Sequence, residues 1–179
     1  MSRLIIVRGL PGSGKSTFAH KAFNGALVLE NDMYHIEDGF YIFNKHDQTD
    51  AVYWCLDMAK NAMLAGMDVV VSNTFTRREF IEPYEVFAKE HGITVKVYHM
   101  TGSYENCHEV PEDVIKRMKN NFQTYDGEFI QQPDHNKDWF LPEDTEWVFK
   151  KNDETELVMS CHKITGKWTF ISDGPHKDN

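Results

Sequence analysis

The chain has 179 residues, of which 41% are hydrophobic and 13% aromatic, and 28 acidic against 19 basic residues give a formal net charge of −9. This length suits one domain with a full core, and the acidic balance disfavours a protein that coats nucleic-acid duplexes, because such coating needs a basic face. The sequence holds no 18-residue apolar run, Arg8 interrupts the first apolar run too early for a signal peptide, and the three cysteines form no CxxC pair. We therefore expect a cytoplasmic protein without a membrane span or a disulfide framework.

Strand and helix signals alternate along the first 125 residues. Short apolar runs predict buried strands at 4–7, 26–29 and 68–72, and a fourth strand is predicted at 93–99. Helices are predicted at 15–23, 50–65 and 114–125, the last with a start signal at 111–113, and another helix ends at residue 90. That helix is predicted to carry a capping box of Thr76 and Glu79 and to kink or restart at Pro83. The alternation predicts an α/β three-layer sandwich with a mainly parallel sheet.

The last part of the chain has a different character. Residues 131–136 are loop-like, and strand signals follow at 146–150, 156–162 and 167–172, the last two joined by a hairpin turn at 163–166. We therefore divide the chain into a core, residues 1–125, and a β-rich C-terminal extension, residues 126–179, which packs on or beside the core.

A glycine-rich motif lies between the first predicted strand and the first predicted helix. It fits the phosphate-binding pattern GxxxxGK[ST], in which backbone N–H groups and the start of a helix cradle phosphate oxygens. Residues 1–29 also contain four basic and no acidic side chains. Lys15 is expected to reach the β- and γ-phosphates of a nucleoside triphosphate, and the Ser16 hydroxyl to coordinate Mg²⁺. The predicted nucleotide-binding residues are Gly9, Leu10, Pro11, Gly12, Ser13, Gly14, Lys15, Ser16 and Thr17.

Polar residues follow two of the predicted strands at the same edge of the sheet. Asp32 comes just after the second strand and is the candidate for accepting a proton from an acceptor hydroxyl, with a helix N-cap as its alternative role. Glu30 is a weaker candidate for the same proton. Asn73, at the end of the third strand, is predicted to bind substrate or to order the Mg²⁺ shell, or else to satisfy its own backbone in a turn.

Several segments together resemble the kinase domain of bacteriophage polynucleotide 5′-hydroxyl kinase: residues 9–17, 31–34, 71–74, 77–80 and 84–92. Residues 106–111 and 115–118 are similar to related P-loop domains of animal ubiquitin-ligase-binding proteins, within the zeta-toxin and AAA_33-like P-loop kinases. The resemblance covers about residues 3–125. It implies an ATP- and Mg²⁺-dependent kinase with a five-stranded P-loop core, in which Lys15 and Ser16 handle phosphates and metal and Asp32 is the general base.

The chain departs from that phage family at three places. His35 stands where the family has a substrate-binding arginine, Asn73 where it has an aspartate, and residues 101–110 contain none of the arginines of its lid. An arginine there stabilises charge on the transferring phosphoryl group, so either transfer is slower or another cation replaces it. We expect Arg117 to do so, because it belongs to the shared Ile-x-Arg-Met pattern; Lys116 and Lys119 are the alternatives, and a solvated helix face is the simpler role for all three.

Other side chains suggest contacts with an acceptor. Arg78, next to Arg77, is a candidate for binding substrate phosphates, as are Lys150 and Lys151, although paired basic residues are commonly plain surface. Four aromatic residues near Asp32 could stack on a base, but core packing is expected for at least half of them: Tyr34, Phe40, Tyr41 and Phe43. The Cys-His pairs at 107–108 and 161–162 lack zinc-finger spacing, so no zinc site is predicted.

Together these features predict an ATP-dependent kinase that transfers the γ-phosphoryl group to a hydroxyl of a nucleic acid or nucleotide, with a polynucleotide 5′-hydroxyl as the expected acceptor. The substrate is expected to meet the protein through local contacts only. Two alternatives stay open: a DNA kinase that phosphorylates a hydroxymethyl group on a modified base, and a nucleotide-binding module without kinase turnover.

Overall fold

A five-stranded parallel sheet forms the centre of the computed structural model, which describes residues 2–37, 40–104, 110–131, 146–152, 155–161 and 168–173, the last three ranges as backbone only. All neighbouring strands in it are parallel. Their order across the sheet is β2 (Leu27–Leu29), β5 (Val69–Asn73), β1 (Arg3–Arg8), β6 (Thr94–Met100) and β7 (Phe129–Gln131). The predicted α/β sandwich with a mainly parallel, five-stranded sheet is confirmed.

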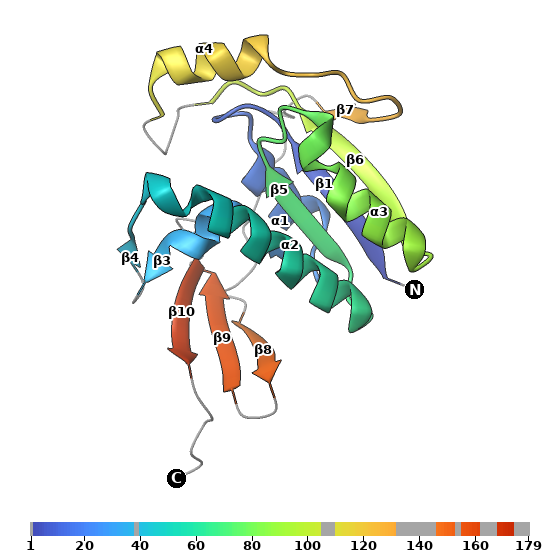
Figure 1. Ribbon diagram of the computed structural model, residues 1–179, viewed down its shortest axis with the longest axis vertical. Helices are drawn as coiled ribbons and strands as arrows, with labels where there is room; N and C mark the ends of the chain where they lie inside the picture. The colour runs from blue at the N-terminus through green and yellow to red at the C-terminus, as the bar shows by residue number, and fades with distance from the viewer. Residues whose placement is uncertain are drawn as a thin grey trace.

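Helices cover both faces of this sheet (Figure 1). On one face, α1 (Lys15–Ala22) packs on a cluster that includes Ile5 of the central strand. On the other face, α2 (Gln48–Leu64) and α3 (Glu82–Glu90) pack on a larger cluster that includes Ile6. Because successive residues of a strand point to opposite faces, the apolar run of β1 supplies both cores. The buried run in the sequence therefore marks the middle of the sheet.

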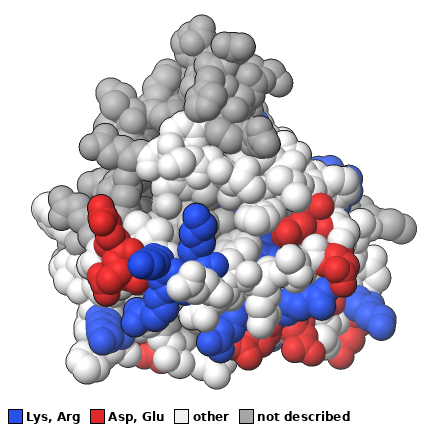
Figure 2. Space-filling view, turned by 90° about the horizontal axis from the view of Figure 1, so that it is seen from above, with Lys and Arg blue, Asp and Glu red and all other residues white. Residues whose placement is uncertain are grey.

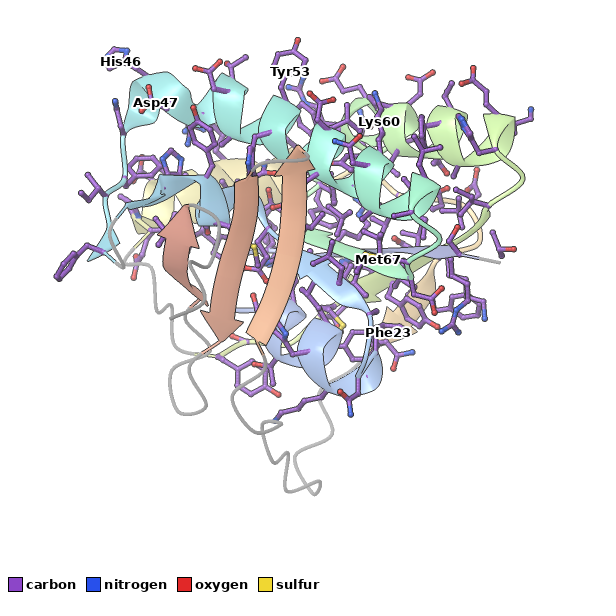
Figure 3. The ribbon with its side chains drawn as sticks, turned by 90° about the horizontal axis from the view of Figure 1, so that it is seen from below. Phe23, His46, Asp47, Tyr53, Lys60 and Met67 are labelled. Carbon is purple, nitrogen blue, oxygen red and sulfur yellow. The ribbon has the colours of Figure 1, made fainter. Side chains whose placement is uncertain are left out.

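The outer face of α2 points away from the sheet. Figure 3 shows Tyr53 projecting outward from this helix, and its side chain is 63% exposed. Phe23, after α1, lies on the opposite side and contacts Phe18 and Tyr98 edge to face. Among the described residues, no helix combines the length and apolarity needed to cross a bilayer.

Strand β7 and helix α4 (Glu112–Asn120) differ from the sequence-based expectation. Strand β7 was not predicted, because it is only three residues long and largely exposed. Helix α4 was predicted to continue to residue 125 and to hold Pro111 in its first turn, but it ends at Asn120 and Pro111 is its N-cap. It ends early because the chain beyond it bonds elsewhere: the Gln123 N–H donates to the Thr76 carbonyl at 2.8 Å.

The predicted capping box of Thr76 and Glu79 is wrong. Arg77 is the N-cap of a short 3₁₀ turn, η3 (Arg78–Phe80), and neither it nor the N-cap of α3 forms a side-chain cap bond. Pro83 lies in the first turn of α3, where its missing N–H costs nothing, so the predicted restart is confirmed.

Three further strands lie in the C-terminal part of the chain. They are β8 (Glu146–Asn152), β9 (Thr155–Cys161) and β10 (Trp168–Asp173), which form an antiparallel sheet at the positions that the sequence predicted. The predicted loop at 131–136 is wrong at its first residue, because Gln131 belongs to β7. Residues 132–136, the turn at 163–166 and most of both Cys-His pairs lie outside the described residues. The division of the chain at residue 125 stays a prediction, and β7 of the central sheet lies just beyond that point.

The stability of the fold is expected to fall in mild acid because of His20. Burial lowers the pKa of this side chain from 6.5 to about 4. The neutral form is favoured in the folded state, so stability is lost as the pH falls from about 6.5 towards 4, by about 1–3 kcal/mol. Urea unfolding at pH 7 and pH 4.5 measures this loss. His20→Gln is expected to lose less stability over that interval than the wild type, and the exposed His46→Gln is the matched control. An equal loss in His20→Gln and wild type would contradict the assignment.

Candidate active site

The glycine-rich loop joins the carboxyl end of β1 to the first turn of α1. Gly14 is the N-cap of α1 with φ 85°, and a Cβ atom there would lie 3.0 Å from the Tyr104 ring. A Cβ at Gly9 would lie 2.5 Å from the Ser13 hydroxyl oxygen and 2.6 Å from the Met100 carbonyl oxygen. No cap side chain covers the first turn of α1. Its free N–H groups therefore face the loop, and this arrangement fits a bound polyphosphate.

Lys15 lies inside this loop. Its Nζ donates a hydrogen bond to the Leu10 carbonyl at 2.9 Å. Burial lowers the pKa of its ammonium group to about 8, and the negative charges of Glu30 and Asp32 oppose that shift. A desolvated ammonium held by one carbonyl gains favourable contacts when phosphate oxygens arrive. The position therefore fits the predicted contact with the β- and γ-phosphates.

Oxygen atoms gather beside the exposed Ser16. The Glu30 carboxylate lies beside the Ser16 and Ser72 hydroxyls; burial raises its pKa, and the Ser16 hydroxyl is the strongest influence that favours its charged form. Within the described residues, Glu30 Oε1 and Ser72 Oγ are buried without a hydrogen-bond partner. Mg²⁺ prefers such oxygen ligands and usually keeps several of its waters. These residues fit a hydrated Mg²⁺, and of the three the sequence predicted only Ser16 as a metal ligand.

Asp32 lies in a 3₁₀ turn, η1 (Asn31–His35), directly after β2. The N-cap of this turn is Glu30, so the alternative in which Asp32 is the cap is wrong. In the described part of the chain, no group is hydrogen-bonded to the Asp32 carboxylate, which leaves it open to an acceptor hydroxyl.

Asn73 fixes the position of this turn. Its Oδ1 accepts a hydrogen bond from the Asn31 N–H at 2.8 Å, and its Nδ2 donates to Cys55 Sγ at 3.8 Å. The side chain thus bonds a neighbouring segment rather than its own turn. The predicted contact of Asn73 with substrate or with the Mg²⁺ shell stays a prediction, while the structure gives it a role in orienting the residues around Asp32.

Asn73→Ala is expected to slow phosphoryl transfer about tenfold and to cost about 1 kcal/mol of stability, because the Asn31 N–H loses its acceptor. Transfer rates at saturating ATP and urea unfolding measure the two effects. Asn31→Ala is the matched control, since it keeps the N–H group and the bond. A transfer rate in Asn73→Ala equal to that of Asn31→Ala would contradict this role.

The other predicted site residues lie in different settings. His35 is 5% exposed and contacts the rings of Tyr34 and Phe43. Arg78 forms an ion pair with Asp126 at 3.1 Å. Arg117 is exposed in the last turn of α4, and the face of the molecule seen in Figure 2 carries basic and acidic side chains side by side. The substrate contacts of His35 and Arg78 and the catalytic role of Arg117 stay predictions.

The aromatic residues after Asp32 are more exposed than expected. Phe40 is 72% exposed, Phe43 53% and Tyr34 37%, while the side chain of Tyr41 is not described. The expectation that at least half of these four rings pack in the core is wrong, because the short strands β3 (Ile36–Glu37) and β4 (Phe40–Tyr41) form a hairpin separate from the main sheet.

The segment after β6 packs on the phosphate loop. The Tyr104 N–H donates to the Gly12 carbonyl at 2.8 Å, and a Cβ at Gly102 would lie 2.7 Å from the Ser13 carbonyl oxygen. The sequence places the lid in 101–110 but does not predict this contact, although a glycine close to the end of a strand is a signal of close backbone approach. Residues 105–109 lie outside the described part.

Comparisons with known proteins agree with this geometry. The family model AAA_33, described as an AAA domain, matches residues 4–125. An uncharacterized protein of Pasteurella multocida (strain Pm70), PM0531, is 28% identical over 138 residues, which cover 66% of this chain and 75% of that protein. Human NEDD4-binding protein 2 is 27% identical over 135 residues; these cover 68% of this chain but only 8% of that protein.

A solved structure shows the same fold. The Mycobacterium tuberculosis APS kinase CysC, in complex with AMPPNP and APS, superposes with a TM-score of 0.51 at 17% identity, over 75% of this chain and 90% of that chain. Since the family model spans more than half of the sequence, the chain belongs to the AAA_33 family, and its core has the fold of P-loop kinases.

Proposed function

We propose that the protein transfers the γ-phosphoryl group of ATP to a hydroxyl of a nucleic acid or nucleotide, with a polynucleotide 5′-hydroxyl as the favoured acceptor. The observation that carries the proposal is the position of Lys15, whose ammonium group lies within the phosphate loop on the Leu10 carbonyl, near enough to Glu30 and Asp32 for both negative charges to oppose the lowering of its pKa by burial. The positive charge of Lys15 suits the donor phosphates, whereas the carboxylates of Glu30 and Asp32 suit the metal and the acceptor hydroxyl. The APS kinase of the same fold was solved with the ATP analogue AMPPNP, which supports ATP as the donor.

The residues divide the reaction between them. Lys15 and the loop N–H groups hold the β- and γ-phosphates, and Asp32 orients the acceptor hydroxyl. Ser16, Glu30 and Ser72 would hold Mg²⁺, which when bound neutralises charge on the β- and γ-oxygens. A bond forms between the acceptor oxygen and the γ-phosphorus, and the bond from that phosphorus to the β–γ bridging oxygen breaks. ADP leaves with the electron pair, and the hydroxyl proton passes to the Asp32 carboxylate.

A nucleic acid or nucleotide acceptor is supported by the exposed aromatic rings beside Asp32. Phe40 and Phe43 follow the turn that carries this carboxylate, and both are more than half exposed. Stacking of a base on such rings is sequence-tolerant and contributes about 1–3 kcal/mol per base. With a net charge of −9, the protein suits a few stacking contacts better than binding along an extended basic surface.

A second acceptor is favoured by a separate observation. The phage family has a substrate-binding arginine and an aspartate at two positions that are His35 and Asn73 here. His35 is 5% exposed, and Asn73 is bonded to Asn31 and Cys55 inside the protein. The two replacements suit an acceptor other than a 5′ end, such as a hydroxymethyl group on a modified base in DNA, which has to be flipped out of the duplex.

A labelling panel tests the proposal. The protein is incubated with γ-labelled ATP, Mg²⁺ and 5′-hydroxyl RNA or DNA, 5′-phosphorylated plain DNA, hydroxymethylated-base DNA, or free nucleosides, with Lys15→Ala as the blank. Label on 5′-hydroxyl ends alone is expected. Label on 5′-phosphorylated hydroxymethylated DNA would instead identify the hydroxymethyl group of the modified base as the acceptor. ATP binding without label on any acceptor would overturn kinase function and favour a nucleotide-binding module.

A further inference from the structure

A buried arginine lies directly before the phosphate loop. Arg8, the last residue of β1, is 0% exposed. Its NH1 donates to Glu128 Oε2 at 3.2 Å, its NH2 donates to the Gln123 carbonyl at 2.7 Å, and its guanidinium lies 4.2 Å from the centre of the Phe122 ring. His99 of β6 completes the cluster: its Nδ1 lies 3.2 Å from Glu128 Oε1, and its ring stacks on Phe122 at 4.7 Å.

The burial of this charge needs an explanation. Burying a guanidinium and a carboxylate costs desolvation free energy, which their mutual attraction only partly offsets. A buried ion pair is therefore weak evidence for a purely stabilising role. Arg8 cannot reach substrate from a fully buried position. Its partners Glu128, Gln123 and Phe122 all belong to the connection between α4 and β7. Arg8 therefore binds this connection rather than a substrate.

Helix α4 depends on this connection for its position. Among its residues, Glu112–Asn120, none is buried, so packing alone holds it weakly. It lies at the end of the sheet where β1 leads into the phosphate loop (Figure 1). The connection also bonds the Thr76 carbonyl, through the Gln123 N–H at 2.8 Å, and Arg78, through the Arg78 N–H to Gln123 Oε1 at 2.9 Å and the Arg78–Asp126 pair; the two Arg78 contacts are exposed. The hydrogen bonds between the connection and Arg8 are better shielded from water than those between the connection and Arg78.

We propose that Arg8 is a positioning residue: by holding the connection after α4 against the end of β1, it keeps α4, and with it Arg117, at the nucleotide end of the sheet. The part of the proposal that concerns Arg117 rests on the proposed function. The anchoring of α4 does not, and the two parts are tested by different measurements.

Hydrogen exchange tests the anchoring without any substrate. Arg8→Met keeps most of the volume of the side chain and removes its charge, and it is expected to speed amide exchange over Glu112–Asn120 about tenfold more than over β5. The matched control is Arg3→Met, at the other end of the same strand, where the arginine is 59% exposed and paired with Asp68; it is expected to leave α4 unchanged. If Arg8→Met does not fold, Glu128→Gln takes its place. Equal acceleration in α4 and β5, or none in α4, would overturn the anchoring.

A double-mutant cycle tests the link to Arg117. If Arg8 acts by keeping Arg117 in place, Arg8→Met is expected to slow transfer at least about tenfold in the wild type but less than about twofold in the Arg117→Ala background. Arg8→Lys, which keeps the charge, is expected to restore part of the rate. The link would be overturned if Arg8→Met slowed transfer by the same factor with and without Arg117→Ala, or if Arg117→Ala alone transferred phosphate at the wild-type rate. A wild type that labels no acceptor would instead count against the proposed function and leave the exchange result standing.

Discussion

Asp32→Asn is expected to slow phosphoryl transfer by about 10²–10⁴-fold, the range that positioned general bases contribute. Asparagine has nearly the same shape, and the backbone of the turn stays fixed by the bond from the Asn31 N–H to Asn73. The variant can still orient a hydroxyl but cannot take its proton. ATP binding is expected to stay the same or to become slightly tighter, because a negative charge near Lys15 is removed. Single-turnover transfer from labelled ATP and calorimetric ATP titration measure the two quantities.

Glu30→Gln is the matched control for this experiment. Glu30 is a carboxylate two residues away, but it is buried beside Ser16 and Ser72, where it suits the metal better than an acceptor. Its replacement is expected to raise the Mg²⁺ concentration needed for half-maximal ATP binding while leaving transfer at saturating Mg²⁺ within about tenfold of the wild type. If Glu30→Gln lowered the transfer rate at saturating Mg²⁺ more than Asp32→Asn does, Glu30 rather than Asp32 would be the general base.

The sequence predicts the centre of this fold well because its signals there are local. The apolar run of β1, the glycines of the loop and the start of α1 follow one another within some twenty residues, and each requires its neighbour. By contrast, β7 forms by pairing with β6, about thirty residues earlier, and its three residues carry no periodicity of their own. The early end of α4 is equally non-local, since Arg8 and Thr76 bind the residues that would have continued the helix.

The same distinction applies to the candidate site. Parallel strands bring their carboxyl ends to one edge, so the sequence could place Lys15, Asp32 and Asn73 near one another. It could not tell which side chain of a strand end faces the loop. In the sheet, Ser72 pairs in register with Val7 and Asn73 with Arg8, and adjacent residues of a strand point to opposite faces. Ser72 therefore lies beside Glu30, while Asn73 bonds Asn31 and Cys55 instead.

Lys15→Met is expected to lower the rate of phosphoryl transfer by about 10²–10³-fold and also to weaken ATP binding, because a donor aimed at the transferring group is lost. Methionine fills most of the same space in the loop, so the loss reflects the missing charge. Steady-state kinetics with labelled ATP give kcat and KM separately, and the fall in kcat/KM is expected to exceed that in kcat. Lys21→Met, on the same helix, is the matched control and is expected to retain the wild-type rate.

The stability of Lys15→Met distinguishes a chemical loss from a folding defect. Burial lowers the pKa of Lys15 to about 8, so at pH 7 the nucleotide-free protein holds an ammonium group that its surroundings disfavour. That cost is present below pH 8 and disappears as the pH rises towards the unfolded value of 10.5. At pH 7 the variant is therefore expected to unfold at a higher urea concentration than the wild type while it transfers phosphate far more slowly. A variant that is both inactive and less stable at pH 7 would contradict this account, because the charge of Lys15 would then serve the fold rather than the nucleotide.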